Sequence, residues 1–305
     1  MSTEVWGMTA MGIAALLAGM VTVRGRVRIV SGAEQAILLG PVFYAVALAV
    51  FAAEHFLGAR DLMAIVPRWL PGALFWTYLV GAAWLAAAVS FIAWRQVRWS
   101  ALLTALLMVI IVVTIDLPRL PAEAHQRLFW TLTVRELAFA SGALVLAGST
   151  WPRESRAGAA LIRSGRTFLS GTMVFYGIEH FFFPRNVTGV PLEKLTPAGV
   201  PAPVLLAWGV GIILLVAGIG LLIRPAIRIA AAGAGAMLVL LTLFFYIPIF
   251  VMEIHSPLAL EGINYVGDTL LFAGTCLLAG FGADLVAVQS PMTGQSLTHA
   301  SGLIH

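Results

Sequence analysis

Histidines that closely follow a glutamate are the residues of this 305-residue chain best suited to chemistry. Four of its six histidines do so. The pairs are Glu54 with His55, Glu123 with His125, Glu179 with His180, and Glu253 with His255. Imidazole exchanges protons near neutral pH, and a carboxylate beside it can orient the ring or relay the proton. The pattern therefore predicts proton exchange, hydrogen bonding to a ligand, or metal binding.

The composition predicts that these pairs belong to a polytopic membrane protein. Hydrophobic residues make up 60% of the chain and charged residues 10%, and the mean hydropathy is +0.96. Soluble domains carry about 25% charged residues. The net charge of +4 comes from arginines spread along the loops, which excludes a broad basic face for nucleic acid. The single cysteine, Cys276, permits no internal disulfide.

Nine apolar stretches are long enough to cross a bilayer, since about 20 helical residues span about 30 Å of hydrocarbon. They cover, roughly, residues 5–23, 33–56, 73–94, 100–117, 127–148, 167–183, 203–223, 229–250 and 264–288. The first stretch has no basic residue before it, and Arg24, Arg26 and Arg28 follow it. This layout predicts a retained helix rather than a cleaved signal peptide.

The distribution of arginines sets the expected orientation. Loops on one side of this topology carry eleven arginines, against six arginines and lysines on the other side. The positive-inside rule places the arginine-rich side in the cytoplasm. We therefore predict a multi-pass protein of a bacterial-type inner (plasma) membrane, with its N-terminus outside and a polar tail from Gln289 in the cytoplasm. All four Glu/His pairs then come near the outer face.

The chain contains an internal repeat. FYAVALAVFAAEHF at residues 43–56 aligns with FLSGTMVFYGIEHF at residues 168–181, an offset of 125. PRLPAEAH at residues 118–125 aligns with PIFVMEIH at residues 248–255, an offset of 130. Each unit holds four predicted spans, an even number, so both copies should share one orientation, unlike the halves of an inverted-repeat transporter.

A deeper pair of acids also matches between the two copies. Glu136 corresponds to Asp268 at an offset of 132, and each lies a third to halfway into its span. An ionised carboxylate there is costly, so we expect it to be protonated, paired or facing a wet cavity. Arg135 offers Glu136 a partner, whereas the matching position beside Asp268 is a glycine. If a helix starts at Pro121, then His125 lies on the same face as Glu136.

Three kinds of ligand suit the Glu/His pairs, and all three stay open at this stage. A quinone or quinol needs a proton acceptor near the membrane surface beside an apolar channel, which His with Glu supplies. Imidazoles and carboxylates also suit a metal such as Zn, Fe, Mn or Cu, although adjacent Glu54 and His55 diverge by about 100° on a helix. A non-covalent haem between, for example, His55 and His125 is the third alternative.

The repeated unit resembles the DoxX/DoxD-like family. The resemblance rests on four spans, a Gly-containing second helix, a His after the third helix and an acidic residue in the fourth, over about 35–150 and 160–285. Glu-His-Phe followed by Val-Pro-Arg-Trp-Leu-Pro at residues 66–71 resembles a poorly characterised branch of the family. The resemblance implies a membrane subunit of a quinone-linked redox system. The family often carries a Glu in the second helix, which 81–84 and 209–212 lack.

Together these patterns predict an all-α membrane protein with one leading helix and two tandem four-helix units. The predicted boundaries are 1–28 for the N-terminal helix, 29–150 for the first unit, 151–288 for the second unit, and 289–305 for the tail. The leading hypothesis is a quinone- or quinol-interacting subunit that works with a redox protein. The alternative is a non-enzymatic scaffold, assembly factor or small-solute carrier, in which polar clusters hold the bundle together.

The quinone hypothesis assigns a role to each polar residue of the repeat. The histidines exchange protons with the head group or hydrogen-bond to it, the glutamates beside them orient the rings, and the deeper acids polarise the pocket from below. These residues are His55, His125, His180 and His255, with Glu54, Glu123, Glu179 and Glu253, and with Glu136 and Asp268.

Overall fold

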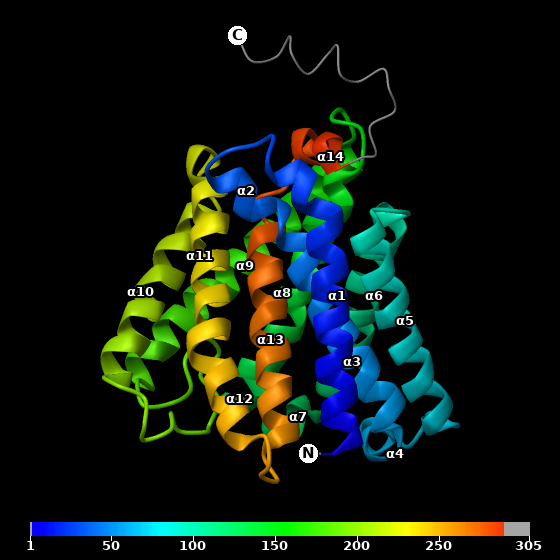
Figure 1. The fold of residues 1–305 in the computed structure, drawn as a ribbon, viewed down its shortest axis with the longest axis vertical. Helices are drawn as coiled ribbons and strands as arrows, with labels where there is room; N and C mark the ends of the chain where they lie inside the picture. Colours follow the sequence, from blue (N-terminus) through cyan, green and yellow to red (C-terminus); the bar gives the residue numbers. More distant parts are fainter. Residues whose placement is uncertain (1, 290–305) are drawn as a thin grey trace.

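The computed structural model describes residues 2–289 as an all-α bundle whose long helices run alternately up and down one axis (Figure 1). The long helices are α1 (Thr3–Val27), α3 (Gly40–Leu57), α5 (Ala73–Ala93), α6 (Val97–Ile111), α8 (Arg127–Ser149), α9 (Arg156–Phe182), α10 (Pro203–Gly220), α11 (Ile227–Leu241) and α13 (Ala259–Leu278). Short helices lie near the ends of the bundle: α2 (Ala33–Leu38), α4 (Ala59–Leu62), α7 (Leu120–Glu123), α12 (Ile247–Glu253) and α14 (Ala283–Gln289). The predicted fold class is confirmed.

Each predicted apolar stretch corresponds to one of these long helices, but not all of them qualify equally as membrane spans. Within residues 2–289, seven helical segments are long and apolar enough to cross a bilayer. The pair α13 and α14 makes an eighth if it counts as one span. Helix α9 is not among them, because Arg166, Glu179 and His180 lower its hydropathy. The protein is therefore a multi-pass membrane protein in which one long helix, α9, is less apolar than the others.

Two predicted boundaries differ from the structure. The last span ends at Leu278, and the chain then bends by 115° into α14. Gln289, predicted to begin the tail, is only 2% exposed and accepts a hydrogen bond from Arg26 at 2.9 Å. The rest of the predicted tail lies outside the described residues. Helix α8 begins at Arg127, as its apolar stretch predicted; the helix near Pro121 is the short α7, so His125 lies between two helices.

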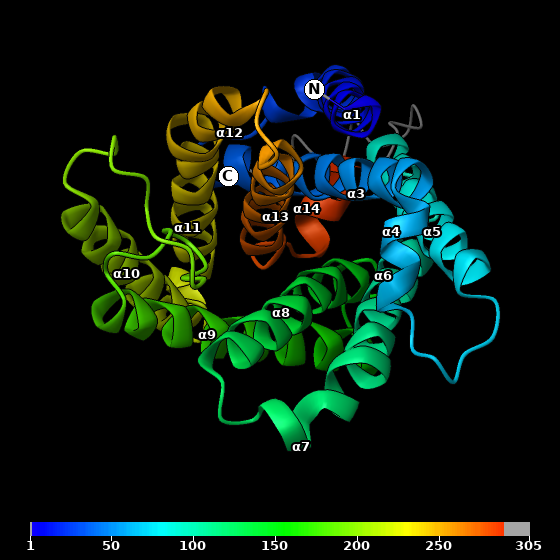
Figure 2. The same ribbon diagram turned by 90° about the horizontal axis from the view of Figure 1, so that it is seen from below.

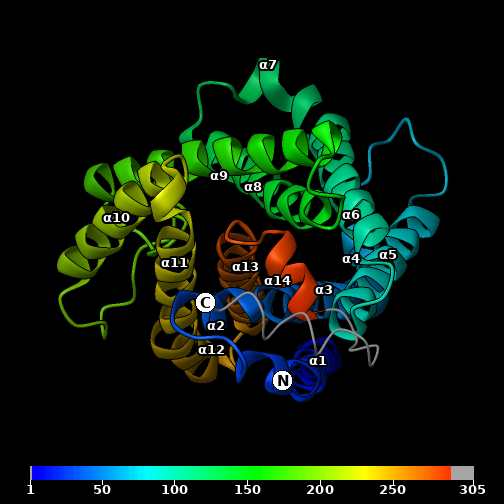
Figure 3. The ribbon, with the colours of Figure 1, turned by 90° about the horizontal axis from the view of Figure 1, so that it is seen from above.

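The eight helices after α1 pack as a closed ring. Helices α3, α5, α6, α8, α9, α10, α11 and α13 each contact the next, and α13 contacts α3. Views along the axis show this arrangement from below (Figure 2) and from above (Figure 3). Helix α8 also packs against α13 across the middle, and α1 packs outside on α3. The first helix of each predicted unit thus packs against the fourth helix of the other unit.

Several local features recur at the offsets of the sequence repeat. A π-helical turn occurs at Val112–Asp116 and again at Thr242–Tyr246, 130 residues later. A proline follows each turn within two residues, and a proline removes one backbone donor from a helix. These features support the proposal of two tandem units. We call residues 29–150 the first unit and residues 151–288 the second unit.

Candidate functional site

A cavity of about 850 Å³, which we call the first-unit cavity, lies between α3, α5, α6 and α8 of the first unit and α13 of the second. Most of its wall is apolar, and it includes the aromatic rings of Trp69, Trp76 and Trp84. Polar lining residues come from α3, α8 and α13. They include Glu54, His55, Arg135, Glu136, Asn264 and Asp268. Ligand pockets typically have about 300–1,000 Å³ and mostly apolar walls with a few placed polar groups. The cavity therefore has the size and the lining of a small-molecule site.

The last turns of α3 contribute Glu54 and His55 to this cavity. Glu54 is 9% exposed and accepts a hydrogen bond from Asn264 Nδ2 at 2.7 Å. His55 Nδ1 lies 2.8 Å from the carbonyl oxygen of Phe51. A carbonyl oxygen can only accept, so Nδ1 carries the proton, and Nε2 of the neutral ring is an acceptor. Within residues 2–289, Nε2 has no hydrogen-bond partner.

The deeper acids of both units meet at one arginine. Arg135 on α8 donates to Asp268 on α13 at 2.6 Å and to Glu136 at 3.0 Å. All three side chains are between 17% and 22% exposed. The expected pairing of Glu136 with Arg135 is present, and the packing of α8 on α13 brings Asp268 to the same guanidinium. With Glu54, three carboxyl groups share the cavity with one guanidinium, so acceptors outnumber cationic donors.

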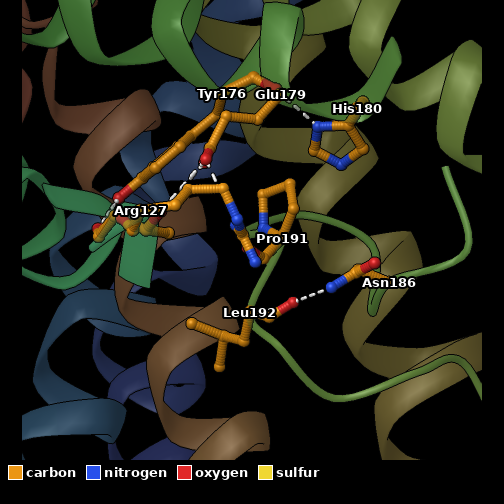
Figure 4. Close-up of polar contacts among 8 residues, drawn as sticks. Arg127, Tyr176, Glu179, His180, Asn186, Pro191 and Leu192 are labelled. Atoms are coloured by element: carbon orange, nitrogen blue, oxygen red, sulfur yellow. Dashed lines mark hydrogen bonds and ion pairs between the residues drawn. The ribbon is translucent and has the colours of Figure 1, made fainter. Parts of the chain in front are cut away.

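The second unit holds a matching but fully bonded acid. Glu179 on α9 is 5% exposed and accepts hydrogen bonds from Thr131 at 3.1 Å and from Arg127 at 3.2 Å (Figure 4). The Tyr176 hydroxyl donates to the carbonyl oxygen of Thr131 at 2.7 Å. Both partners of Glu179 come from α8, in the other unit. This arrangement mirrors Glu54, whose partner Asn264 comes from α13.

The loop between α9 and α10 covers His180, which is 1% exposed. His180 Nδ1 lies 2.6 Å from the carbonyl oxygen of Tyr176, and Nε2 accepts a hydrogen bond from the Gly189 N–H at 2.9 Å. Tyr246 donates to the carbonyl oxygen of Thr188, and Arg127 donates to that of Pro191. Both ring nitrogens of His180 are therefore engaged within the protein.

The other two Glu/His pairs, Glu123 with His125 and Glu253 with His255, lie at the same end of the bundle but do not join either cluster. His125 and His255 are exposed, and neither lines the first-unit cavity. Glu123 pairs with Arg119 on the surface at 2.7 Å. Glu253 ends α12 and is half-buried. Within residues 2–289, no three His, Cys, Asp or Glu side chains are arranged to hold a metal ion.

Sequence reasoning missed the side chains that bond to the paired glutamates. Asn264 lies four residues before Asp268 on α13, so the two share a helix face. Thr131 likewise follows Arg127 by four residues on α8. Polar residues at this spacing in apolar helices were a usable signal. The backbone N–H of Gly189 carries no side-chain signal, so its contact with His180 required the fold.

Two family models match the chain, in corresponding parts of the two units. Residues 161–247 match DoxX, and residues 44–131 match a domain of unknown function, DUF8561. No curated protein and no solved structure matches the chain. The DoxX match agrees with the helical membrane fold and with the resemblance found in the sequence. The chain is thus a multi-pass membrane protein that carries a DoxX-like domain at residues 161–247.

Proposed function

We propose that this protein is a quinone- or quinol-interacting membrane subunit whose first-unit cavity holds the head group. The observation that carries the proposal is a large apolar cavity that is also lined by a histidine with a free acceptor nitrogen and by three carboxyl groups. A quinol needs hydrogen-bond acceptors for its hydroxyls and apolar walls for its tail. The aromatic rings of Trp69, Trp76 and Trp84 supply flat surfaces against which a ring can pack.

The residues of the cavity can hold and release protons. Oxidation of a quinol to a quinone releases two protons and two electrons. In this proposal, His55 Nε2 and the Glu54 carboxyl group accept the protons near the end of α3, and Asn264 keeps Glu54 in place. The two electrons pass to a partner redox protein, which this function requires.

We further propose that the arginine-rich end of the bundle faces the cytoplasm. Arg24 and Arg26 lie in the last turn of α1, and α1 ends at the same end of the bundle as α14, opposite to the end that carries α4, α7 and α12 (Figure 1). The site then lies near the outer surface, where protons can leave.

Labelling of introduced cysteines tests this orientation. A membrane-impermeant maleimide should label His125→Cys but not Ser155→Cys in sealed, right-side-out vesicles. The reverse pattern would overturn the orientation.

A structural role is the second candidate, and the polar cluster of the second unit favours it. Glu179 and His180 are buried, and their hydrogen bonds tie α9 to α8 and to the loop before α10. Such bonds hold helices together without any ligand. We therefore assign the second-unit cluster to the stability of the bundle and the first-unit cavity to the ligand.

Two neighbouring alanines on α5 test the proposal. Ala83 lines the cavity, whereas Ala82 is exposed on the same helix and does not line it. We expect Ala83→Phe to fill the cavity and weaken the binding of a decyl-substituted benzoquinone at least about tenfold, since overlapping atoms cannot pack. Ala82→Phe should leave binding unchanged. Quenching of tryptophan fluorescence measures both affinities in detergent, and equal affinities for the two variants would refute the proposal.

A further inference from the structure

His55 and His180 have the same local geometry. Nδ1 of each ring bonds the carbonyl oxygen four residues earlier, at 2.8 Å for His55 and 2.6 Å for His180. A glycine of the next long helix packs against the Cβ atom of each histidine. A Cβ added at Gly81 would lie 2.7 Å from His55 Cβ, and one at Gly211 would lie 2.9 Å from His180 Cβ. In both rings, Nε2 is therefore presented as an acceptor in the same way.

The second unit satisfies this acceptor with its own backbone. The Gly189 N–H donates to His180 Nε2 at 2.9 Å. Gly189 has a φ of +109°, a conformation that favours glycine. The residues on either side are anchored, because Thr188 accepts from Tyr246 and Pro191 accepts from Arg127. The loop between α9 and α10 thus occupies the position in which a ligand would reach the histidine.

The first unit leaves the same acceptor free. The segment between α4 and α5 lines the cavity through residues such as Val66, Pro67 and Trp69 and donates no hydrogen bond to His55. His55 itself lines the cavity. His180 receives a hydrogen bond from the Gly189 N–H, whereas among residues 2–289 His55 lacks the corresponding hydrogen-bond donor.

We infer that the first-unit cavity binds a ring whose hydroxyl group donates a hydrogen bond to His55 Nε2. The cavity therefore binds a hydroquinone in preference to the quinone, and each chain binds one molecule. This inference rests on the proposed function. A quinone carbonyl can only accept, so it cannot bond to an unprotonated Nε2. The second unit binds no such molecule, because Gly189 already occupies the matching nitrogen.

The other polar groups of the cavity agree with a donating ligand. The carboxyl groups of Glu54, Glu136 and Asp268 add acceptors beside His55. Several side-chain donors are already engaged; among the described residues, Arg135 Nε has no partner, and neither does the acceptor Asn264 Oδ1. Asn264 Nδ2 bonds Glu54 at 2.7 Å, both terminal nitrogens of Arg135 bond acids, and Trp76 Nε1 bonds the carbonyl oxygen of Pro71 at 2.9 Å. A ligand that brings donors therefore finds partners more readily than one that brings only acceptors.

The test compares decyl-benzohydroquinone with its dimethyl ether, which has the same ring and tail but no O–H group. Isothermal titration of the purified full chain under reducing conditions should give one hydroquinone per chain. The dimethyl ether should bind about fivefold to tenfold more weakly, because one hydrogen bond contributes about that factor. In His55→Ala, the hydroquinone should lose this advantage over the ether.

Two matched histidine variants complete the design. His125→Ala removes an exposed histidine outside the cavity and should keep the preference for the hydroquinone. His180→Ala should keep one hydroquinone per chain as well. Two molecules per chain, or an unchanged preference in His55→Ala, would overturn the inference while leaving the proposed function standing. If neither the hydroquinone, the ether nor the quinone binds, the proposed function fails together with the inference.

Discussion

At the scale of single residues, the environment separates two glutamates that the sequence presents as equivalent. Glu54 and Glu179 each precede a histidine at the end of the first helix of a unit. Glu179 is held by a guanidinium and a hydroxyl, whereas Glu54 has one amide partner and lines an open cavity. A charge whose partners lie inside the protein contributes to stability, and a charge beside a cavity can act on a ligand.

Removal of Arg127 tests the structural role of the second-unit cluster. We expect Arg127→Ala to lower the free energy of unfolding by roughly 3 kcal/mol, because it leaves the Glu179 carboxylate, whose side chain is 6% exposed, without its cationic partner. Arg119→Ala is the control. The side chain of Arg119 is 53% exposed in its pair with Glu123, so the loss should stay below about 1 kcal/mol. Denaturant titration in detergent measures both, and equal losses would contradict the assignment.

The candidate residues were predictable by type but not by grouping. The pairs at residues 54–55 and 179–180 were recognised from their repetition. His125 and His255 lie apart from them, exposed in the chain segments before α8 and α13. Sequence distance along one helix is fixed by the helical repeat, but contacts between helices depend on how the bundle packs.

At the scale of elements, small residues determine how closely the first two helices of each unit approach. Gly81 on α5 faces His55, and Gly211 on α10 faces His180. The apolar stretches predicted these helices well, since hydropathy identifies membrane spans. The π-helical turns and the bend after Leu278 were not predicted, because they change backbone bonding without changing hydropathy.

Two glycines of α10 test the close approach of this helix to His180. An alanine at Gly211 would place its Cβ 2.9 Å from His180 Cβ and 3.0 Å from the carbonyl oxygen of Gly177. We expect Gly211→Ala to cost about 1–3 kcal/mol of stability through overpacking. Gly209 has open space around the same position, so Gly209→Ala should be neutral or gain up to ~1 kcal/mol from helix propensity. Thermal unfolding in detergent decides, and a stable Gly211→Ala would contradict the packing.

At the scale of the whole molecule, the ring of helices makes each site from both units. Asn264 of the second unit positions Glu54 of the first, and Arg127 of the first positions Glu179 of the second. The sequence repeat predicted two units but not this exchange of partners, because it contains no information about which helices meet. The helices and the all-α fold class could thus be predicted, whereas the packing of the helices and the cavity could not.

The central claim is that the first-unit cavity binds a quinone or quinol, and photo-crosslinking tests it most directly. The probe is a decyl-benzoquinone with a diazirine on its tail, and mass spectrometry maps the labelled peptides of the full chain. We predict saturable labelling at the cavity wall, within residues 51–84 and 103–115, that an excess of unlabelled quinone prevents. Saturable labelling confined to residues 151–258, which do not line the cavity, or labelling that unlabelled quinone does not reduce, would contradict the claim.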